Sequence, residues 1–267
     1  MSKRVEGKAA IVVGGGQTRG QTVGNGRATA IVLGREGAEV CVVDRALASA
    51  QETADMIRAE GGKAWAFEAD VTREADVKRL VAEARQRFGR LDILHNNVGA
   101  SLALGDASAT ELTEEAYDRS LAVNLKATWL TCKHALPALR ERNGSIVNIA
   151  SMAAWNAYPL VGYKTTKAAV VALTENLAAH NARYGVRANS ILPGLMNTPM
   201  AIESRVAAGT PREDVIAARD RRVPLGRRMG TGWDVAYAAL YLHSDEAAFI
   251  TGVSLAVDGG ESVCWGS

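Results

Sequence analysis

The feature that most constrains the fold is an alternation of short apolar runs with longer segments of helical period. Seven runs are candidate strands, at 10–13, 39–43, 63–68, 91–96, 145–149, 187–192 and 254–257. Helical periodicity fills most intervals between them, at 26–35, 46–60, 73–88, 113–140, 163–184 and 233–243. Several runs are apolar almost throughout, which is typical of strands covered by helices on both faces. The alternation predicts an α/β fold with a single doubly wound parallel β-sheet of about seven strands, flanked by helices on both faces.

The domain organisation is expected to be simple. No repeat, low-complexity tract or linker divides the 267 residues, so we expect residues 1–267 to form a single domain. The stretch 195–228 has no clear period, and its length is typical of a lid or of a disordered segment. We expect a substrate lid at about 195–228.

Charge and cysteine content exclude several classes of protein. The 31 basic and 29 acidic side chains nearly cancel to a net charge of +2, which predicts neither a nucleic-acid nor a membrane partner. The first apolar run is too short for a signal peptide or a membrane span, so we expect a cytoplasmic protein. The cysteines Cys41, Cys132 and Cys264 are far apart and form no C-x-x-C pair, so we expect no disulfide framework and no metal site.

A glycine-rich turn follows the first apolar run. Its glycines are Gly14, Gly15, Gly16, Gly20, Gly24 and Gly26. Glycine at a strand-to-helix turn lets the backbone approach a pyrophosphate, whose charge the helix N-terminus stabilises; a flexible surface loop is the alternative. Asp44, which ends the second run, follows Gly26 at close to the spacing of about 20 residues typical of a ribose-binding acid. A carboxylate at this place favours NAD over NADP, although Arg45 and Arg19 could tolerate a 2′-phosphate.

Further motifs follow in order along the chain. They are Gly20-x-x-x-Gly24-x-Gly26, Asp70-Val71, Asn96-Asn97-Val98-Gly99, Asn124, Ser151, Tyr163-x-x-x-Lys167 and Pro193-Gly194 with Thr198. Each is weak alone, but together the chain resembles the short-chain dehydrogenase/reductases over almost its whole length. The resemblance implies a Rossmann-like fold, a nicotinamide cofactor, an alcohol or ketone substrate and a homotetramer. The tail Val263-Cys264-Trp265 is a candidate interface element.

Tyr163 and Lys167 stand four residues apart, so a helix places both side chains on one face. Lowering a phenol pKa from about 10 to about 7 needs about 4 kcal/mol, and one cation at about 5 Å supplies roughly 3 kcal/mol. Lys167 and the positive nicotinamide ring of NAD⁺ would together be enough. By the resemblance, Tyr163 is the general acid/base, Ser151 orients the substrate oxygen, and Asn124 holds a water that relays protons to Lys167. A solvated Tyr–Lys pair, a helix-cap serine and a packed asparagine are the structural alternatives.

A larger set of residues is predicted to bind the cofactor, partly from the resemblance and partly from spacing and charge. They are Gly14, Arg19, Gly20, Gly24, Asn25, Gly26, Asp44, Arg45, Asp70, Val71, Asn97, Gly99, Tyr163, Lys167, Pro193, Gly194, Met196 and Thr198. One departure from the family is large, because Gly14 and Gly24 are ten residues apart where the family usually closes this motif after four. We expect an insertion of about six residues, 16–21, whose tip brings Arg19 to a cofactor phosphate or ribose. A phosphate site displaced outward is the alternative.

The substrate is less constrained, because this fold does not determine it. Trp155 and Met200 are expected to contact substrate beside Ser151 and Tyr163, and an aromatic wall with a polar edge suits a sugar or a cyclic alcohol. Segment 195–228 holds seven arginines against four acids. They could bind an anionic substrate, but i,i+4 pairing with the acids favours a solvated helix face.

The sequence therefore predicts an NAD-dependent oxidoreductase that transfers a hydride between nicotinamide and a secondary alcohol or ketone. An NADPH-dependent 3-oxoacyl thioester reductase is an alternative, against which Asp44 argues. A non-catalytic NAD-binding regulator is another, but it would not need Ser151, Tyr163 and Lys167 together.

Overall fold

The structure, a computed structural model, describes residues 3–264 and contains one seven-stranded parallel sheet. The strands are β1 Ala9–Val13, β2 Glu39–Asp44, β3 Lys63–Glu68, β4 Ile93–Asn96, β5 Ser145–Ile149, β6 Arg187–Pro193 and β7 Ser254–Val257. Their order is β3-β2-β1-β4-β5-β6-β7, and every neighbouring pair is parallel. The α/β fold with a doubly wound parallel sheet is confirmed, with strand ends within two residues of those expected.

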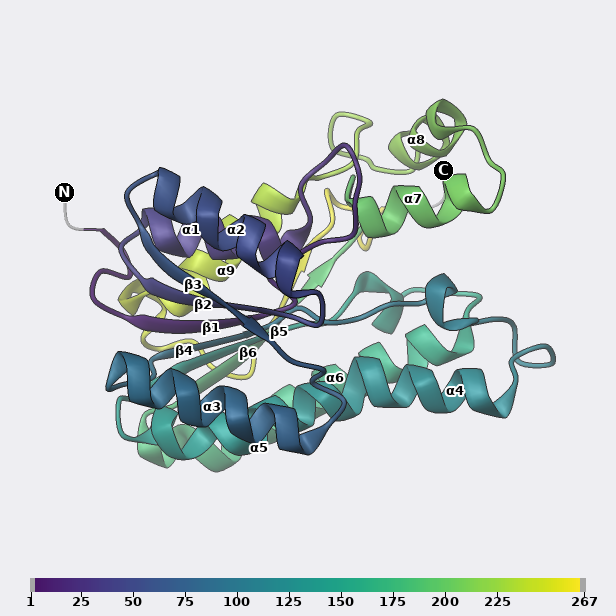
Figure 1. Cartoon of the computed structure of the whole chain (residues 1–267). Helices are drawn as coiled ribbons and strands as arrows, with labels where there is room; N and C mark the ends of the chain where they lie inside the picture. Colours follow the sequence, from purple (N-terminus) through teal and green to yellow (C-terminus); the bar gives the residue numbers. More distant parts are fainter. Residues whose placement is uncertain (1–2, 265–267) are drawn as a thin grey trace.

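Helices cover both faces of the sheet (Figure 1). They are α1 Asn25–Arg35, α2 Leu47–Ala59, α3 Glu74–Phe88, α4 Glu114–Ser120, α5 Ala127–Arg140, α6 Val161–Asn181, α7 Pro199–Ala207, α8 Arg212–Asp220 and α9 Gly232–His243. α1, α2 and α9 lie on one face, and α3, α5 and α6 on the other. In β1, Ile11 and Val13 join the core on the α3 side while Ala10 and Val12 join the core on the α1 side. This burial on both faces explains why β1 is apolar at every position.

The segment expected to be one helix, 113–140, is interrupted. α4 and α5 are joined by a π-helical turn, Leu121–Lys126, in which Asn124 is fully buried. Such turns often occur at functional sites. Periodicity could not reveal the interruption, because the chain remains helical on both sides of it.

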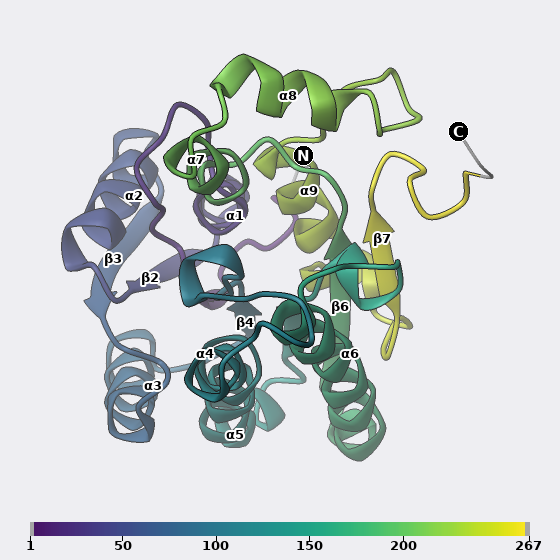
Figure 2. The ribbon, with the colours of Figure 1, turned by 90° about the vertical axis from the view of Figure 1, so that its right-hand side faces the viewer.

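Segment 195–228, for which the sequence shows no clear period, contains regular structure. Both α7 and α8 lie within it, each nine residues long. Pro199 occupies the first turn of α7 and Pro211 precedes α8, positions where a missing N–H costs nothing. The apolar stripes are too short to give a clear period. The two helices lie apart from the layers, at the edge where the strands end (Figures 1 and 2).

Membrane spans, cysteines and the C-terminal tail were the other features considered in the sequence. Within residues 3–264, no helix is long and apolar enough to cross a membrane. Cys41 and Cys132 are buried free thiols and Cys264 is an exposed one. Trp265, part of the candidate interface tail, lies outside the described residues.

Candidate active site

The motif residues meet at the carboxyl edge of the sheet. β1 and β4 are neighbours although the chain turns away from β1 toward β2, so their carboxyl ends form a topological switch point. Ligands of open α/β sheets bind at such a point. Gly14 follows β1, Asn97 follows β4 and Ser151 lies just beyond β5. The fold thus gathers residues separated by more than a hundred positions.

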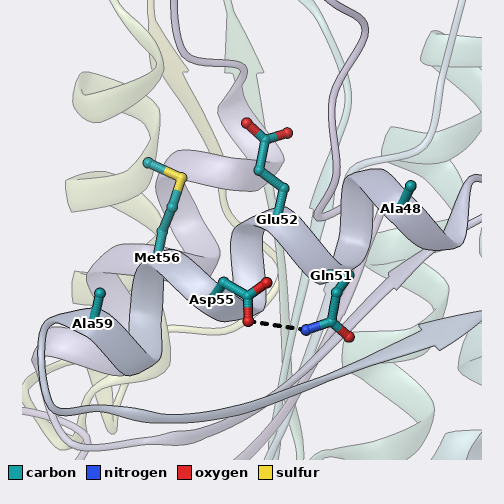
Figure 3. A pocket seen from close by; sticks show the side chains of 6 residues that line it. All are labelled: Ala48, Gln51, Glu52, Asp55, Met56 and Ala59. Carbon is teal, nitrogen blue, oxygen red and sulfur yellow. Dashed lines mark hydrogen bonds between the residues drawn. The ribbon is translucent and has the colours of Figure 1, made fainter.

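A separate hollow lies on the outer face of α2 (Figure 3). Its lining comes from this one helix: Ala48, Gln51, Glu52, Asp55, Met56 and Ala59. Gln51 Nε2 donates to Asp55 Oδ1 at 3.1 Å across one helical turn. Because none of the motif residues lines this hollow, we do not place the active site there.

The two ends of the glycine-rich turn touch. Gly14 has a φ of +72°, and a Cβ on Gly26 would lie 2.0 Å from the Gly14 carbonyl oxygen. Asn97 Nδ2 donates to that same oxygen at 3.2 Å, which ties the turn to the end of β4. With its ends this close, the turn must bulge outward between them. This geometry is the one that an insertion requires.

The inserted residues span from α2 to α7. Gln17 N donates to Ser49 Oγ at 2.8 Å on α2, and the Gln17 side chain accepts from Gly24 N at 3.0 Å to close the loop. Farther along, a Cβ on Gly20 would lie 2.7 Å from Glu203 Oε1 of α7. The approach to α7 was not expected from the sequence, which placed the tip over the adenosine end alone.

Arg19, at the tip of the insertion, is exposed. The pKa of Glu52 on α2 is lowered mainly by a hydrogen bond from Arg27, with smaller contributions from the charges of Arg27 and Arg19. Arg19 is therefore near α2. Its contact with a cofactor phosphate or ribose stays a prediction.

The carboxylate of Asp44 faces the glycine-rich turn. A Cβ on Gly16 would lie 2.7 Å from Asp44 Oδ2, while Oδ1 accepts from Ala46 N at 3.0 Å. Arg45 is exposed beside it. Asp70 is engaged within its own turn, where its Oδ1 accepts from Thr72 N and Oγ1 at 3.0 and 2.7 Å. Val71 is buried in the hydrophobic core, and the contact of this pair with a cofactor stays a prediction.

The turn fits a dinucleotide in two independent respects. α1 begins after Gly24 without a side-chain cap, so N–H groups of its first turn are available to a phosphate. Asn25 Oδ1 is buried and has no hydrogen-bond partner among residues 3–264. A buried acceptor of this kind is costly unless a ligand supplies a donor.

Ser151, Tyr163 and Lys167 come together at the ends of β5 and α6. The Tyr163 phenol is hydrogen-bonded with the Ser151 side chain. Lys167 Nζ lies 5.7 Å from the centroid of the Tyr163 ring and donates to the Ile149 carbonyl oxygen at 2.7 Å. The helical spacing read from the sequence thus places both α6 side chains beside Ser151.

The local environment shifts both ionisable groups. Burial raises the pKa of Tyr163 to about 12, the hydrogen bond with Ser151 opposes this rise, and Tyr158 adds to it. Burial lowers the pKa of Lys167 to about 8, so its ammonium group is still mostly charged at pH 7. A phenol with a pKa of about 12 is not a base at neutral pH. A base role for Tyr163 would therefore require further positive charge beside it, as the electrostatic arithmetic from the sequence also indicates.

Asn124 connects the turn after β4 to α6. Its Oδ1 accepts from Ala100 N at 2.8 Å, and its Nδ2 donates to the Ala100 carbonyl at 3.0 Å and to Thr166 Oγ1 at 3.2 Å. A Cβ on Gly99 would lie 2.8 Å from Lys167 Nζ, so only glycine leaves that approach open. Asn124 therefore has a positioning role, and its water-holding role stays a prediction.

The segment after β6 crosses the edge of the sheet. Gly194, which follows Pro193, donates its N–H to the Val257 carbonyl at 3.0 Å. Met196 is buried and bridges to Gly230, and Thr198 is buried directly before α7. Trp155 and Met200 are 52% and 45% exposed at the same end of the molecule, and their contacts with substrate stay predictions.

Asp106 is a site residue that the sequence reasoning missed. Its Oδ1 accepts from Gly162 N at 2.8 Å and its Oδ2 from Tyr163 N at 2.7 Å, so it caps α6 from a loop 57 residues earlier. The signal was a missing cap, because Leu160 at the N-cap of α6 has no side-chain acceptor. Because the first N–H groups of α6 lack a cap from the adjacent sequence, a side chain from another segment must accept their hydrogen bonds.

Comparisons with known proteins agree with this geometry. A family model described as enoyl-(acyl carrier protein) reductase matches residues 20–262. A crystal structure from Burkholderia xenovorans, described as that of a short-chain dehydrogenase/reductase, superposes with a TM-score of 0.93 at 41% identity and covers 99% of this chain and 100% of that one. The chain belongs to the short-chain dehydrogenase/reductase family. The family predicted from the motifs is confirmed.

Curated relatives match over nearly their full length. A 2-(S)-hydroxypropyl-CoM dehydrogenase of Xanthobacter autotrophicus is 37% identical, with 97% of this chain and 98% of the relative covered. A 2,5-dichloro-2,5-cyclohexadiene-1,4-diol dehydrogenase of Sphingobium indicum is 37% identical, with 98% and 99% covered. An L-fucose dehydrogenase of Bos taurus is 39% identical, with 100% and 93% covered. These names support the predicted dehydrogenase and count against the non-catalytic regulator.

Proposed function

We propose that this short-chain dehydrogenase/reductase oxidises a secondary alcohol to a ketone with NAD⁺, and that Tyr163 is the general acid/base. The observation that carries the proposal is the arrangement of Tyr163, hydrogen-bonded with Ser151 and flanked by the Lys167 ammonium 5.7 Å from its ring. A phenol, a hydroxyl donor and a fixed cation together suit proton exchange with an alcohol oxygen.

Each residue has a separate part in the reaction. The Tyr163 phenolate accepts the proton from the alcohol O–H, and the phenol returns it in ketone reduction. The Ser151 hydroxyl hydrogen-bonds the reacting oxygen and so orients it. The Lys167 charge stabilises the phenolate. NAD⁺, when bound, would supply the hydride acceptor and a positive charge that lowers the pKa of Tyr163.

The choice of NAD over NADP rests on Asp44. Its carboxylate, directed at the glycine-rich turn, would accept hydrogen bonds from ribose hydroxyls and repel a 2′-phosphate. The same carboxylate argues against an NADPH-dependent 3-oxoacyl thioester reductase, although the family model is described as an enoyl reductase. The relatives' names widen the range of alcohols to test, from a thioether alcohol to a cyclic diol and a sugar.

The test is a panel of sugars, cyclic diols and short secondary alcohols with NAD⁺ or NADP⁺, followed by nicotinamide absorbance. We expect NAD⁺ reduction with at least one alcohol, and a loss of about three orders of magnitude or more in Tyr163→Phe with NADH binding retained, because removal of a general base typically costs 10²–10⁴-fold. Tyr237→Phe, the same change at an exposed tyrosine of α9, is the matched control. Turnover in Tyr163→Phe equal to that of the wild type would refute the role of Tyr163.

Assembly, the lid and location are also proposals. The family resemblance supports a homotetramer, the position of α7 and α8 at the carboxyl edge supports a lid, and the composition supports a cytoplasmic protein. A molecular mass by light scattering tests the assembly.

A further inference from the structure

The lid arginines do not pair as the sequence favoured. Arg212 Nη2 lies 2.5 Å from Glu203 Oε2, an ion pair that joins α8 to α7. Arg222 Nη2 lies 2.9 Å from Glu261 Oε1, near the end of the chain. Neither is an i,i+4 pair on one helix face. Glu203 and Glu261 are therefore already engaged in ion pairs with other arginines.

Arg219, on α8, differs from these two. It is half-buried, and its Nε donates to Met229 Sδ at 3.2 Å and its Nη2 to the Met196 carbonyl at 3.4 Å. Within residues 3–264, no carboxylate forms an ion pair with it. Its neighbour Asp220 is engaged, since Asp220 Oδ1 accepts from Met229 N at 2.7 Å. A guanidinium carries five N–H donors, so three of them remain for another acceptor.

The surroundings of Arg219 are short of negative charge. The pKa of Arg219 is lowered to about 10, mainly by burial and in addition by the charges of Arg205 and Arg222. Tyr158 and Glu261 act in the opposite direction, but Glu261 is already paired with Arg222. A partly buried cation without an anion is costly. An anionic ligand would remove that cost.

Arg219 also lies at the candidate active site. Met196, whose carbonyl it contacts, belongs to the segment after β6. Tyr158 is close enough for its charge to act on both Arg219 and Tyr163, and its ring centroid lies 5.8 Å from that of Tyr163. Tyr158 therefore lies near both the Tyr163 phenol and the Arg219 guanidinium.

We propose that the substrate is a secondary alcohol that carries an oxyanion group, a carboxylate, sulfonate or phosphate, at the end remote from the hydroxyl, and that Arg219 binds this group. The planar fork of arginine matches such groups by paired N–H···O bonds. The inference rests on the proposed function, because it assigns the substrate class of that same site.

The test compares charged and neutral substrates of one shape. Hydroxyalkanoates of four to eight carbons, with the hydroxyl on the penultimate carbon, are assayed beside their amides, and the matching sulfonates and phosphate esters identify the preferred anion. We expect kcat/KM to favour the anion over the amide by about 10- to 100-fold at the best chain length, the range for a hydrogen-bonded charge.

The variants separate binding from folding. Arg219→Gln is expected to raise KM for the anion by about 10- to 100-fold and to change kcat/KM for the amide less than threefold. Arg219→Lys keeps the positive charge but loses the planar, forked guanidinium. Its KM for the anion is expected to lie between those of the wild type and Arg219→Gln. Arg221→Gln makes the same charge change at an exposed lid position and is expected to match the wild type. Should Arg219→Gln not fold, the wild-type KM for the anion is measured against NaCl, where it must rise while that for the amide does not.

The outcomes separate this inference from the proposed function. Equal kcat/KM for anions and amides in the wild type overturns the role of Arg219 while leaving the dehydrogenase intact. An equal loss on both substrates in Arg219→Gln would also overturn it, and make Arg219 a structural contact of the lid. Absence of turnover on every alcohol, with NADH still bound, instead defeats the proposed function.

Discussion

In the proposed function, the charge of Lys167 stabilises the Tyr163 phenolate. The lysine side chain is 2% exposed and held by the Ile149 carbonyl. Buried charge at short range is weakly screened by salt, so we expect the ammonium to favour the phenolate. The same burial that makes the ammonium effective also lowers its own pKa to about 8.

Lys167→Met is therefore expected to raise the apparent pKa of the group that controls alcohol oxidation. A cation favours the phenolate, so its removal moves the rising limb of the pH profile to higher pH. At about 5 Å and an effective dielectric near 20 the lost interaction is roughly 3 kcal/mol, or about 100-fold in rate at neutral pH. Initial rates across pH measure the shift. Lys126→Met, which removes an exposed lysine from the π-helical turn, is the control; an unshifted profile in Lys167→Met would contradict the role.

The Asp106 carboxylate binds the backbone N–H groups in the first turn of α6, the helix that carries Lys167. Asp106→Asn keeps one acceptor for two N–H groups, at Gly162 and Tyr163. We expect the free energy of unfolding to fall by about 1–2 kcal/mol and kcat to fall while the dissociation constant of NADH is unchanged. Denaturant unfolding and kinetics measure the two effects. Glu111→Gln, an exposed acid of the same loop, is the control. A loss of stability with unaltered kcat would limit Asp106 to holding the fold.

At the scale of elements, the decisive contact is that of α1 with the end of β1. Gly26, in the first turn of α1, approaches the Gly14 carbonyl so closely that no side chain fits. The inserted residues between them reach α2 on one side and α7 on the other. The turn thus joins the cofactor end of the site to its lid.

Gly26→Ala is expected to weaken NADH binding at least tenfold. Its Cβ would lie 2.0 Å from a backbone oxygen, so the turn must move, and overpacking of this kind costs about 1–3 kcal/mol. Gly34→Ala is the matched control, because its Cβ would lie 2.5 Å from Ile57 Cγ2 and so overpacks the same helix at the end remote from the proposed cofactor site. Fluorescence titration with NADH compares the two. Equal affinity in both variants would show that the close approach does not shape the cofactor site.

Across the whole molecule, a pair of histidines in the core sets how stability depends on pH. His95 Nδ1 on β4 and His243 Nε2 on α9 lie 3.5 Å apart, and His243 Nδ1 pairs with Ser145 Oγ at 2.8 Å. Burial lowers the pKa of His95 to about 3. It also lowers that of His243, with further lowering by His95, Arg187 and Lys8. Both rings are therefore neutral in the folded protein.

The folded protein should lose stability as the pH falls below about 6.5. There the unfolded histidines take up protons that the folded ones cannot, so the free energy of unfolding declines by up to about 1.4 kcal/mol per pH unit for each ring. For His95 this amounts to about 2 kcal/mol between pH 7 and pH 5. Denaturant unfolding at both pH values measures it. His95→Leu is expected to reduce the dependence and the exposed His180→Gln to retain it; an equal dependence in His95→Leu and wild type would contradict this assignment.

The sequence by itself determined the sheet, the family and the positions of Ser151, Tyr163 and Lys167. These follow from periodicity and from spacings within one helix or one strand-to-turn junction, where the chain's own geometry places the side chains. The glycines and Asp44 were likewise predictable, since they lie at the ends of adjacent strands.

Only the tertiary structure decided which distant residues serve that site. Asp106 caps α6 across 57 positions, the insertion meets α7, and Arg219 is left without an acid although four acids stand within its segment. The i,i+4 pairing expected for this segment is absent, because no acid of 195–228 stands four residues from an arginine of that segment. The ion pairs that form instead join Arg212 to Glu203 of α7 and Arg222 to Glu261. Contacts between elements depend on how those elements pack, and a local pattern does not contain that information.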